Sequence, residues 1–108
     1  MARFGRTFVA CALGLLLPLA PAAQAADATV TIDNFTFNPA TITISPGTRV
    51  VWLNRDDIPH LVVGRDDKSI KSPPLDTGSS YAFTFAHPGT YEYFCGIHPM
   101  MQGTVLVR

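Results

Sequence analysis

The sequence predicts an all-β domain made of two packed sheets. Apolar and polar residues alternate with a period of two through most of the chain after residue 25, which is the pattern of half-buried strands. Gly, Pro, Asn and Asp interrupt this alternation at short intervals, so the strands must be short. The same region shows no helical period, and an antiparallel two-sheet sandwich or barrel is therefore the expected architecture.

Seven strands are expected along this region. In order they are 28–33, 40–45, 49–54, 60–63, 80–86, 90–95 and 103–107. Pro-Gly pairs at 46–47 and 88–89 mark turns between strands. Residues 65–78 break the alternation with several charges and two adjacent prolines, and we expect this segment to cross the surface.

The first 25 residues have the features of a secretory signal peptide. Arg3 and Arg6 precede an apolar stretch over 8–20, and Ala23-Gln24-Ala25 is a small-x-small cleavage site. The apolar stretch is too short and wrongly flanked for a stable membrane span. We therefore predict a signal peptide over 1–25, a single domain over 26–108, and export to the periplasm as a soluble protein, expected to be a monomer.

The domain is small and nearly neutral. Cleavage leaves 108 − 25 = 83 residues with six Lys and Arg against eight Asp and Glu, a net charge of 6 − 8 = −2. Both signs are scattered, which argues against a nucleic-acid footprint and against a basic patch for anionic lipid. A core of this size needs tight packing or a bound metal, and we expect Trp52 to pack between the sheets with Phe83 and Phe85.

Cysteine usage is the first indication of a site. Cys11 lies inside the predicted signal peptide, so Cys95 is the single thiol of the exported domain. Cys11 also lies too early in the apolar stretch for a lipoprotein signal. An unpaired Cys in an oxidising compartment needs an explanation; it is either a buried, inert thiol or a metal ligand.

Four donor residues favour the metal. Cys95, His98 and Met101 follow a C-x2-H-x2-M spacing. His60, which comes directly after Pro59, lies some thirty-five positions upstream of Cys95. Strand alternation turns Cys95 inward at the end of its strand. Two imidazoles, one thiolate and a weak axial thioether suit copper in electron transfer. The thioether argues against zinc.

The pattern W-x-N-x4-P-H followed by P-G-T-Y-x-Y-x-C-x2-H-P-x-M-x-G resembles the cupredoxins. The short ligand loop is most similar to that of the amicyanins, with pseudoazurins and plastocyanins as broader relatives. The matching residues are Trp52, Asn54, Pro59, His60, Pro88, Gly89, Thr90, Tyr91, Tyr93, Cys95, His98, Pro99, Met101 and Gly103.

This resemblance implies a Greek-key sandwich that holds one type 1 blue copper. His60, Cys95 and His98 would lie in the copper plane with Met101 axial. Asn54 would lie behind the ligands, tie the His60 loop to the Cys95 loop and tune the thiolate by hydrogen bonding.

The expected function is the transfer of single electrons by Cu(II)/Cu(I) cycling. A protein partner such as a dehydrogenase or a c-type cytochrome would dock weakly near His98. The docking surface would be an apolar collar formed by Ile58, Pro59, Ile97, Pro99 and Met100. An exported copper carrier or storage protein is the alternative. A copper enzyme is not expected, because only His87, interpreted as an exposed turn residue, remains for a second copper.

Overall fold

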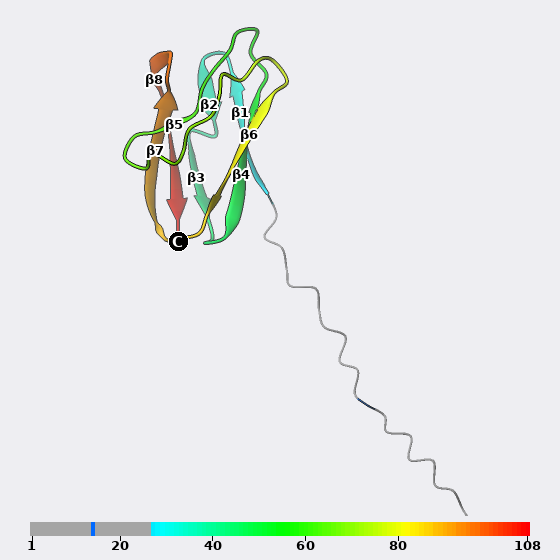
Figure 1. The fold of residues 1–108 in the computed structure, drawn as a ribbon, viewed down its shortest axis with the longest axis vertical. Helices are drawn as coiled ribbons and strands as arrows, with labels where there is room; N and C mark the ends of the chain where they lie inside the picture. The colour runs from blue at the N-terminus through cyan, green and yellow to red at the C-terminus, as the bar shows by residue number, and fades with distance from the viewer. Residues whose placement is uncertain (1–13, 15–26) are drawn as a thin grey trace, which may run out of the picture.

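Two four-stranded sheets face each other in the computed structural model, which describes residue 14 and residues 27–108 (Figure 1). The strands are β1 (Ala28–Asp33), β2 (Thr36–Asn38), β3 (Thr41–Ile44), β4 (Thr48–Asn54), β5 (Val63–Gly64), β6 (Ser80–Phe85), β7 (Gly89–Cys95) and β8 (His98–Val107). One sheet has the order β2-β1-β4-β6 and the other β3-β8-β7-β5. The all-β sandwich predicted from the sequence is confirmed.

The predicted signal peptide, residues 1–25, lies outside the described residues apart from Gly14. The described residues contain no helix long and apolar enough to cross a membrane.

Both sheets are mixed, so the expectation of purely antiparallel pairing is wrong. β1 runs parallel to β4, with Val30 opposite Trp52. β3 runs parallel to β8, with Thr41 opposite Thr104. Alternation along single strands reports which face is buried but not which strand is the neighbour, and parallel pairs require long crossovers that no local turn signal marks.

Three strands differ from the prediction by more than one residue at an end. β2 was missed because it is only three residues long. The strand expected over 60–63 is reduced to β5, and His60 instead forms an isolated bridge with Leu75. β8 starts at His98 rather than at residue 103, so the segment expected to be a loop is the first half of the longest strand.

Trp52 lies at the centre of the core, fully buried. Its ring centroid is 5.3 Å from that of Tyr93, 5.8 Å from that of Tyr81 and 6.4 Å from that of Phe85. Phe83 packs on Phe85 at 4.9 Å instead. The expected contact with Phe85 is therefore present, and tyrosines supply the remaining aromatic neighbours.

The charges and prolines of residues 65–78 predicted a segment that crosses the surface, but part of this segment is buried. Ile70 and Leu75 are buried in the core, together with Ser72. The hydroxyl of Ser72 accepts a hydrogen bond from the Val62 amide at 2.7 Å. This segment therefore fixes the chain that leads into and out of His60.

Tyr93 connects the core to the sheet that carries Cys95. Its ring lies across Gly103 on β8, where an added Cβ would meet the Tyr93 Cζ at 2.2 Å. The Tyr93 hydroxyl and the Trp52 Nε1 are both buried, and neither forms a hydrogen bond of normal geometry within the described residues. Burial raises the pKa of Tyr93 to about 12, and the nearby indole N–H of Trp52 opposes this rise only in part.

We expect Tyr93 to make the fold sensitive to alkali. The folded pKa of about 12 lies above the ordinary value of 10.0, so above pH 10 the tyrosine ionises more readily in the unfolded chain than in the folded one. The free energy of unfolding is therefore fully retained below pH 10 and falls as the pH rises towards 12. Between those values each pH unit lowers the free energy of unfolding by up to about 1.4 kcal/mol. Urea titrations at pH 9 and pH 11 measure the loss. Tyr93→Phe is the control, and an equal loss in that variant would contradict the assignment.

Candidate metal centre

The predicted donor residues meet at one end of the sandwich, at the top of Figure 1. Three connections converge there, namely the β1–β2 turn, the segment after β4 and the β7–β8 turn (Figure 1). His60 and Cys95 are both 0% exposed, whereas His98 is partly exposed. The site is therefore closed on the inside and reaches the surface through one imidazole.

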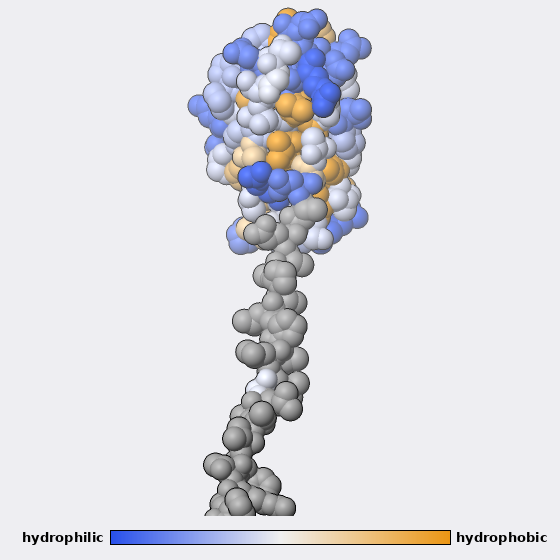
Figure 2. Space-filling view, turned by 90° about the vertical axis from the view of Figure 1, so that its right-hand side faces the viewer, coloured by the Kyte–Doolittle hydropathy of each residue, from blue (hydrophilic) through white to orange (hydrophobic). Residues whose placement is uncertain are grey.

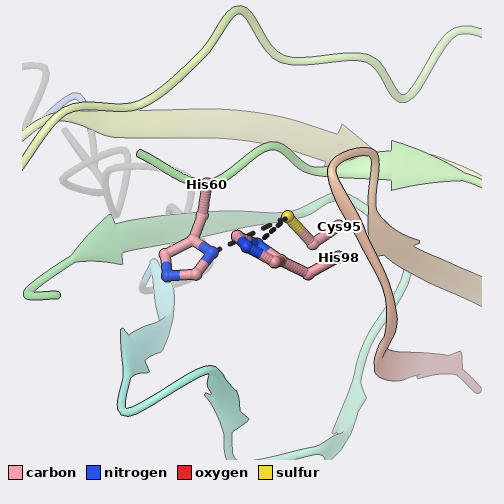
Figure 3. A group of neighbouring side chains, drawn as sticks. All are labelled: His60, Cys95 and His98. Atoms are coloured by element: carbon pink, nitrogen blue, oxygen red, sulfur yellow. Dashed lines mark hydrogen bonds between the residues drawn. The ribbon is translucent and has the colours of Figure 1, made fainter. Parts of the chain in front are cut away.

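Three of the four predicted donors point at one another. The ligand atoms of His60, Cys95 and His98 lie within 4.8 Å of one another. The Cys95 Sγ is 3.7 Å from the His60 Nδ1 and 3.6 Å from the His98 Nδ1, as the dashed lines in Figure 3 show. A sulfur and a nitrogen bound to one ion at about 2.3 and 2.0 Å, with an angle near 120°, lie roughly 3.7 Å apart. These separations fit donors that share one metal ion.

Cys95 and His98 belong to one tight hairpin. Cys95 ends β7, His98 starts β8, and the two residues face each other across a turn made of Gly96 and Ile97. The register of the hairpin shifts between Phe94 and Cys95. Such a bulge re-aims a side chain at the end of a strand.

A backbone amide also donates a hydrogen bond to the Cys95 sulfur. The Leu61 amide donates to the Cys95 Sγ at 3.4 Å. A hydrogen bond to a thiolate withdraws electron density from it and is one of the means by which proteins tune copper sites. Leu61 follows His60 directly, so the same short segment supplies one donor and holds another.

His60 is placed by a network that Asn54 organises. The Asn54 side-chain amide donates to the Ile58 carbonyl at 2.9 Å and to the Leu75 carbonyl at 2.8 Å. Its Oδ1 accepts from the Asp56 amide at 2.9 Å. These bonds hold the His60 loop against Leu75, and none of them reaches the Cys95 loop, contrary to the expectation from the family pattern. The residue after Cys95 is Gly96, which offers no side chain for such a bond.

Asp56 is a residue of the site that the sequence analysis missed. Its Oδ2 lies 2.7 Å from the His60 Nε2. The Phe35 amide lowers the pKa of Asp56 most strongly; partial burial opposes this, and the bonds to His60 and Asn34 lower it further. Because an ionised carboxylate only accepts hydrogen bonds, the His60 Nε2 is the donor to Asp56, and in the neutral tautomer with this donor the lone pair is on Nδ1, the nitrogen on the Cys95 side. Asp56 stands four residues before His60, a spacing that the alternating pattern did not single out.

The two adjacent methionines have opposite surroundings. Met101 is buried in β8, whereas Met100 is 91% exposed. Parity along β8 therefore turns Met101, and not Met100, towards the interior. This agrees with the predicted division of roles, and axial ligation by Met101 stays a prediction.

The surface around His98 is apolar. A shallow depression of about 430 Å³ is lined by Phe35, Ile97, His98, Pro99, Met100 and Met101. From the side drawn in Figure 2 only a few hydrophobic groups are visible at the upper rim of the molecule, the end where β7 turns into β8 in Figure 1. Ile97, Pro99 and Met100 were expected there. Phe35 was not expected, because it precedes the pattern by many residues.

A family model for the cupredoxin-like domain matches residues 6–107. The chain belongs to the cupredoxins. This cupredoxin is 36% identical over 98 residues to an amicyanin of Paracoccus versutus, with 84% of this chain and 73% of that protein covered. It is 33% identical over 90 residues to amicyanin-alpha of Methylorubrum extorquens, with 80% and 76% covered.

The fold of this chain is also similar to solved cupredoxin structures. A purple cupredoxin from Nitrosopumilus maritimus is similar with a TM-score of 0.71 and 33% identity, and 76% of this chain and 100% of that chain are covered. A copper-containing nitrite reductase of Thermus scotoductus also contains this fold, with a TM-score of 0.71 and 32% identity. There the match covers 77% of this chain but only 22% of the enzyme chain.

Proposed function

We propose that this cupredoxin is an exported type 1 blue copper protein that carries single electrons between protein partners. The observation that carries the proposal is the convergence of the Cys95 Sγ with the Nδ1 atoms of His60 and His98 at 3.7 and 3.6 Å on a cupredoxin fold. His60, Cys95 and His98 would bind one copper ion, and Met101 would supply a weak axial thioether. Bound there, copper would supply a one-electron Cu(II)/Cu(I) couple.

The fold contributes to this function by holding the donor side chains in fixed positions. His60 is held by Asn54 and Asp56, and Cys95 is held at the end of a paired strand. A donor set that does not rearrange suits both oxidation states and lowers the cost of electron transfer. The full burial of His60 and Cys95 also keeps water from the thiolate.

His98 is the proposed exit for the electron. It is partly exposed and lines the apolar depression together with Ile97, Pro99 and Met100. A weak partner such as a dehydrogenase or a c-type cytochrome would dock there through a small interface. We further propose that residues 1–25 are removed near Ala25 and that the domain works as a monomer in the periplasm.

The rival functions fit the geometry less well. A protein that hands over copper gains from an open site, whereas two of the predicted donors are fully buried. An enzyme of the nitrite reductase kind needs further histidines for a catalytic copper. Among the described residues the remaining histidine is His87, exposed in the turn between β6 and β7. We therefore propose an electron carrier rather than an enzyme.

Met100→Glu tests the docking surface. We expect the copper-loaded variant to keep its visible spectrum and potential but to exchange electrons with a small c-type cytochrome roughly tenfold more slowly. The reason is that a carboxylate placed in an apolar interface must lose water on docking. Stopped-flow mixing of the reduced variant with the oxidised cytochrome measures the rate.

Thr90→Glu is the matched control, because Thr90 is exposed near the start of β7, at the other end of the sandwich. It adds the same charge and should leave the exchange rate unchanged. Equal slowing by both variants would show that the added negative charge, and not its position, slows electron exchange. That result would remove the support for docking at His98. A copper-loaded protein that exchanges no electrons at all would overturn the proposed function.

A further inference from the structure

We infer that Asp56 is a positioning residue that couples the buried donor His60 to an exposed aromatic cap, Phe35, so that the docking surface and the metal centre form one unit. The inference rests on the proposed function for its electron-transfer meaning. Its geometric part stands on the side chain of Asp56, which is 13% exposed and accepts hydrogen bonds from two separate segments.

The first segment is the β1–β2 turn. Asn34 and Phe35 have φ angles of 50° and 56°, the left-handed region that residues other than Gly rarely occupy. These backbone angles are unfavourable for residues with a Cβ atom, so the surrounding structure must hold this turn in place.

The Asp56 carboxylate supplies that support. Its Oδ1 accepts from the Asn34 amide and its Oδ2 from the Phe35 amide, both at 2.9 Å. Successive backbone N–H groups in a turn form a concave site for an anion. Hydrogen bonds to a charged acceptor are also stronger than neutral ones. The turn is therefore built around this one carboxylate.

The second segment is the donor itself. The Oδ2 that accepts from Phe35 also lies 2.7 Å from the His60 Nε2. The main chain of Asp56 is fixed as well, because its amide donates to the Asn54 Oδ1 and its carbonyl accepts from the Thr77 hydroxyl. A carboxylate held in this way fixes both the tautomer and the orientation of the imidazole.

Phe35 completes the unit on the outside. Its ring stands edge to face against His60, with centroids 5.6 Å apart, and against His98, with centroids 5.2 Å apart. It is 51% exposed and lines the apolar depression beside His98. One side of the Phe35 ring therefore packs against both imidazoles, while the rest is open to a docking partner.

Two consequences follow for substitutions of Asp56. Loss of the carboxylate removes a strong acceptor from His60, which makes the imidazole a poorer donor to Cu(II) than to Cu(I) and raises the reduction potential. Loss of the same group frees the Asn34 and Phe35 amides and releases the cap. One substitution must therefore change both properties, although Phe35 and His60 are far apart in the sequence.

Asp56→Asn and Asp57→Asn form the matched pair for the test. Both remove one negative charge at neighbouring positions, but Asp57 is exposed and its side chain makes no hydrogen bond or ion pair with the described residues. Asp56→Asn should lower the preference for Cu(II) over Cu(I) by about tenfold, which voltammetry records as a rise of about 59 mV. Asp57→Asn should give a much smaller rise.

Amide exchange in the copper-free protein tests the cap without any metal. In Asp56→Asn the amides of Asn34 and Phe35 should exchange about tenfold faster or more, and nuclear Overhauser contacts from the Phe35 ring to His60 and His98 should weaken. Asp56→Ala should show the same changes, which guards against an Asn side chain that replaces the bonds. Asp57→Asn should show none of them.

Equal potential shifts in the two Asn variants, or unchanged amide exchange in Asp56→Asn and Asp56→Ala, would overturn the inference. These results are distinct from a failure of the proposed function. A variant pair that behaves as expected in a protein that exchanges no electrons with a partner would leave the coupling intact and refute only the electron carrier. If the protein bound no copper, amide exchange and ring contacts would still decide the coupling.

Discussion

Replacing Cys95 with serine is expected to abolish the intense blue colour of the copper-loaded protein. The colour would arise from charge transfer between the Cys95 thiolate and Cu(II). Cys95 is the single free cysteine among the described residues, and its Sγ lies within 3.7 Å of both histidine Nδ1 atoms. A serine hydroxyl is a hard donor that stays protonated near neutral pH, so both the band and the tight binding should be lost. A visible spectrum after addition of Cu(II) measures the change.

Ile97→Ser is a suitable control for this experiment. It changes the same hairpin turn at an exposed, non-donor side chain and should leave the band intact. A Cys95→Ser protein that kept the intense band would exclude Cys95 as the ligand and, with it, the proposed copper site.

Exchanging Met101 for leucine is expected to keep copper bound and raise its reduction potential. The three donors that the structure brings together would remain, while a thioether is replaced by a hydrocarbon. The loss of a donor disfavours the more highly charged Cu(II) more than Cu(I). A tenfold change in this preference corresponds to a rise of about 59 mV, which voltammetry resolves.

Met100→Leu is the matched control, because Met100 is the neighbouring methionine and is 91% exposed. Its potential should equal that of the unchanged protein. A potential that responded to Met100 and ignored Met101 would reverse the assignment of the axial residue.

Most of the strands and the proximity of Cys95 to His98 could be read from the sequence because both leave local marks. β1 was predicted to the residue, and β4, β6 and β7 to within one residue at each end. Cys95 and His98 are three residues apart, so a turn had to bring them together. The proximity of His60 depended on the resemblance to the cupredoxins, since nothing local to His60 indicates what it faces.

The rest depends on contacts between segments that are distant in the sequence. The parallel pairing of β1 with β4 and of β3 with β8 has no local mark. Phe35 and Asp56 belong to the site only because a carboxylate reaches a turn 21 residues earlier in the chain. Asn54 was expected to tie the His60 loop to the Cys95 loop, but its side chain bonds to main-chain groups of Ile58, Leu75 and Asp56, which no residue pattern reveals.

The place of β8 in its sheet bears on how the protein is made. β8 is the last strand to be synthesised, yet it lies between β3 and β7 and pairs with both. Until residue 107 has been translated, β3 has no neighbour in its sheet, β7 pairs only with β5, and the core between the sheets cannot close. The proposed metal site, whose donors Cys95 and His98 flank the turn between β7 and β8, can therefore form only after the last strand of the described domain has been made.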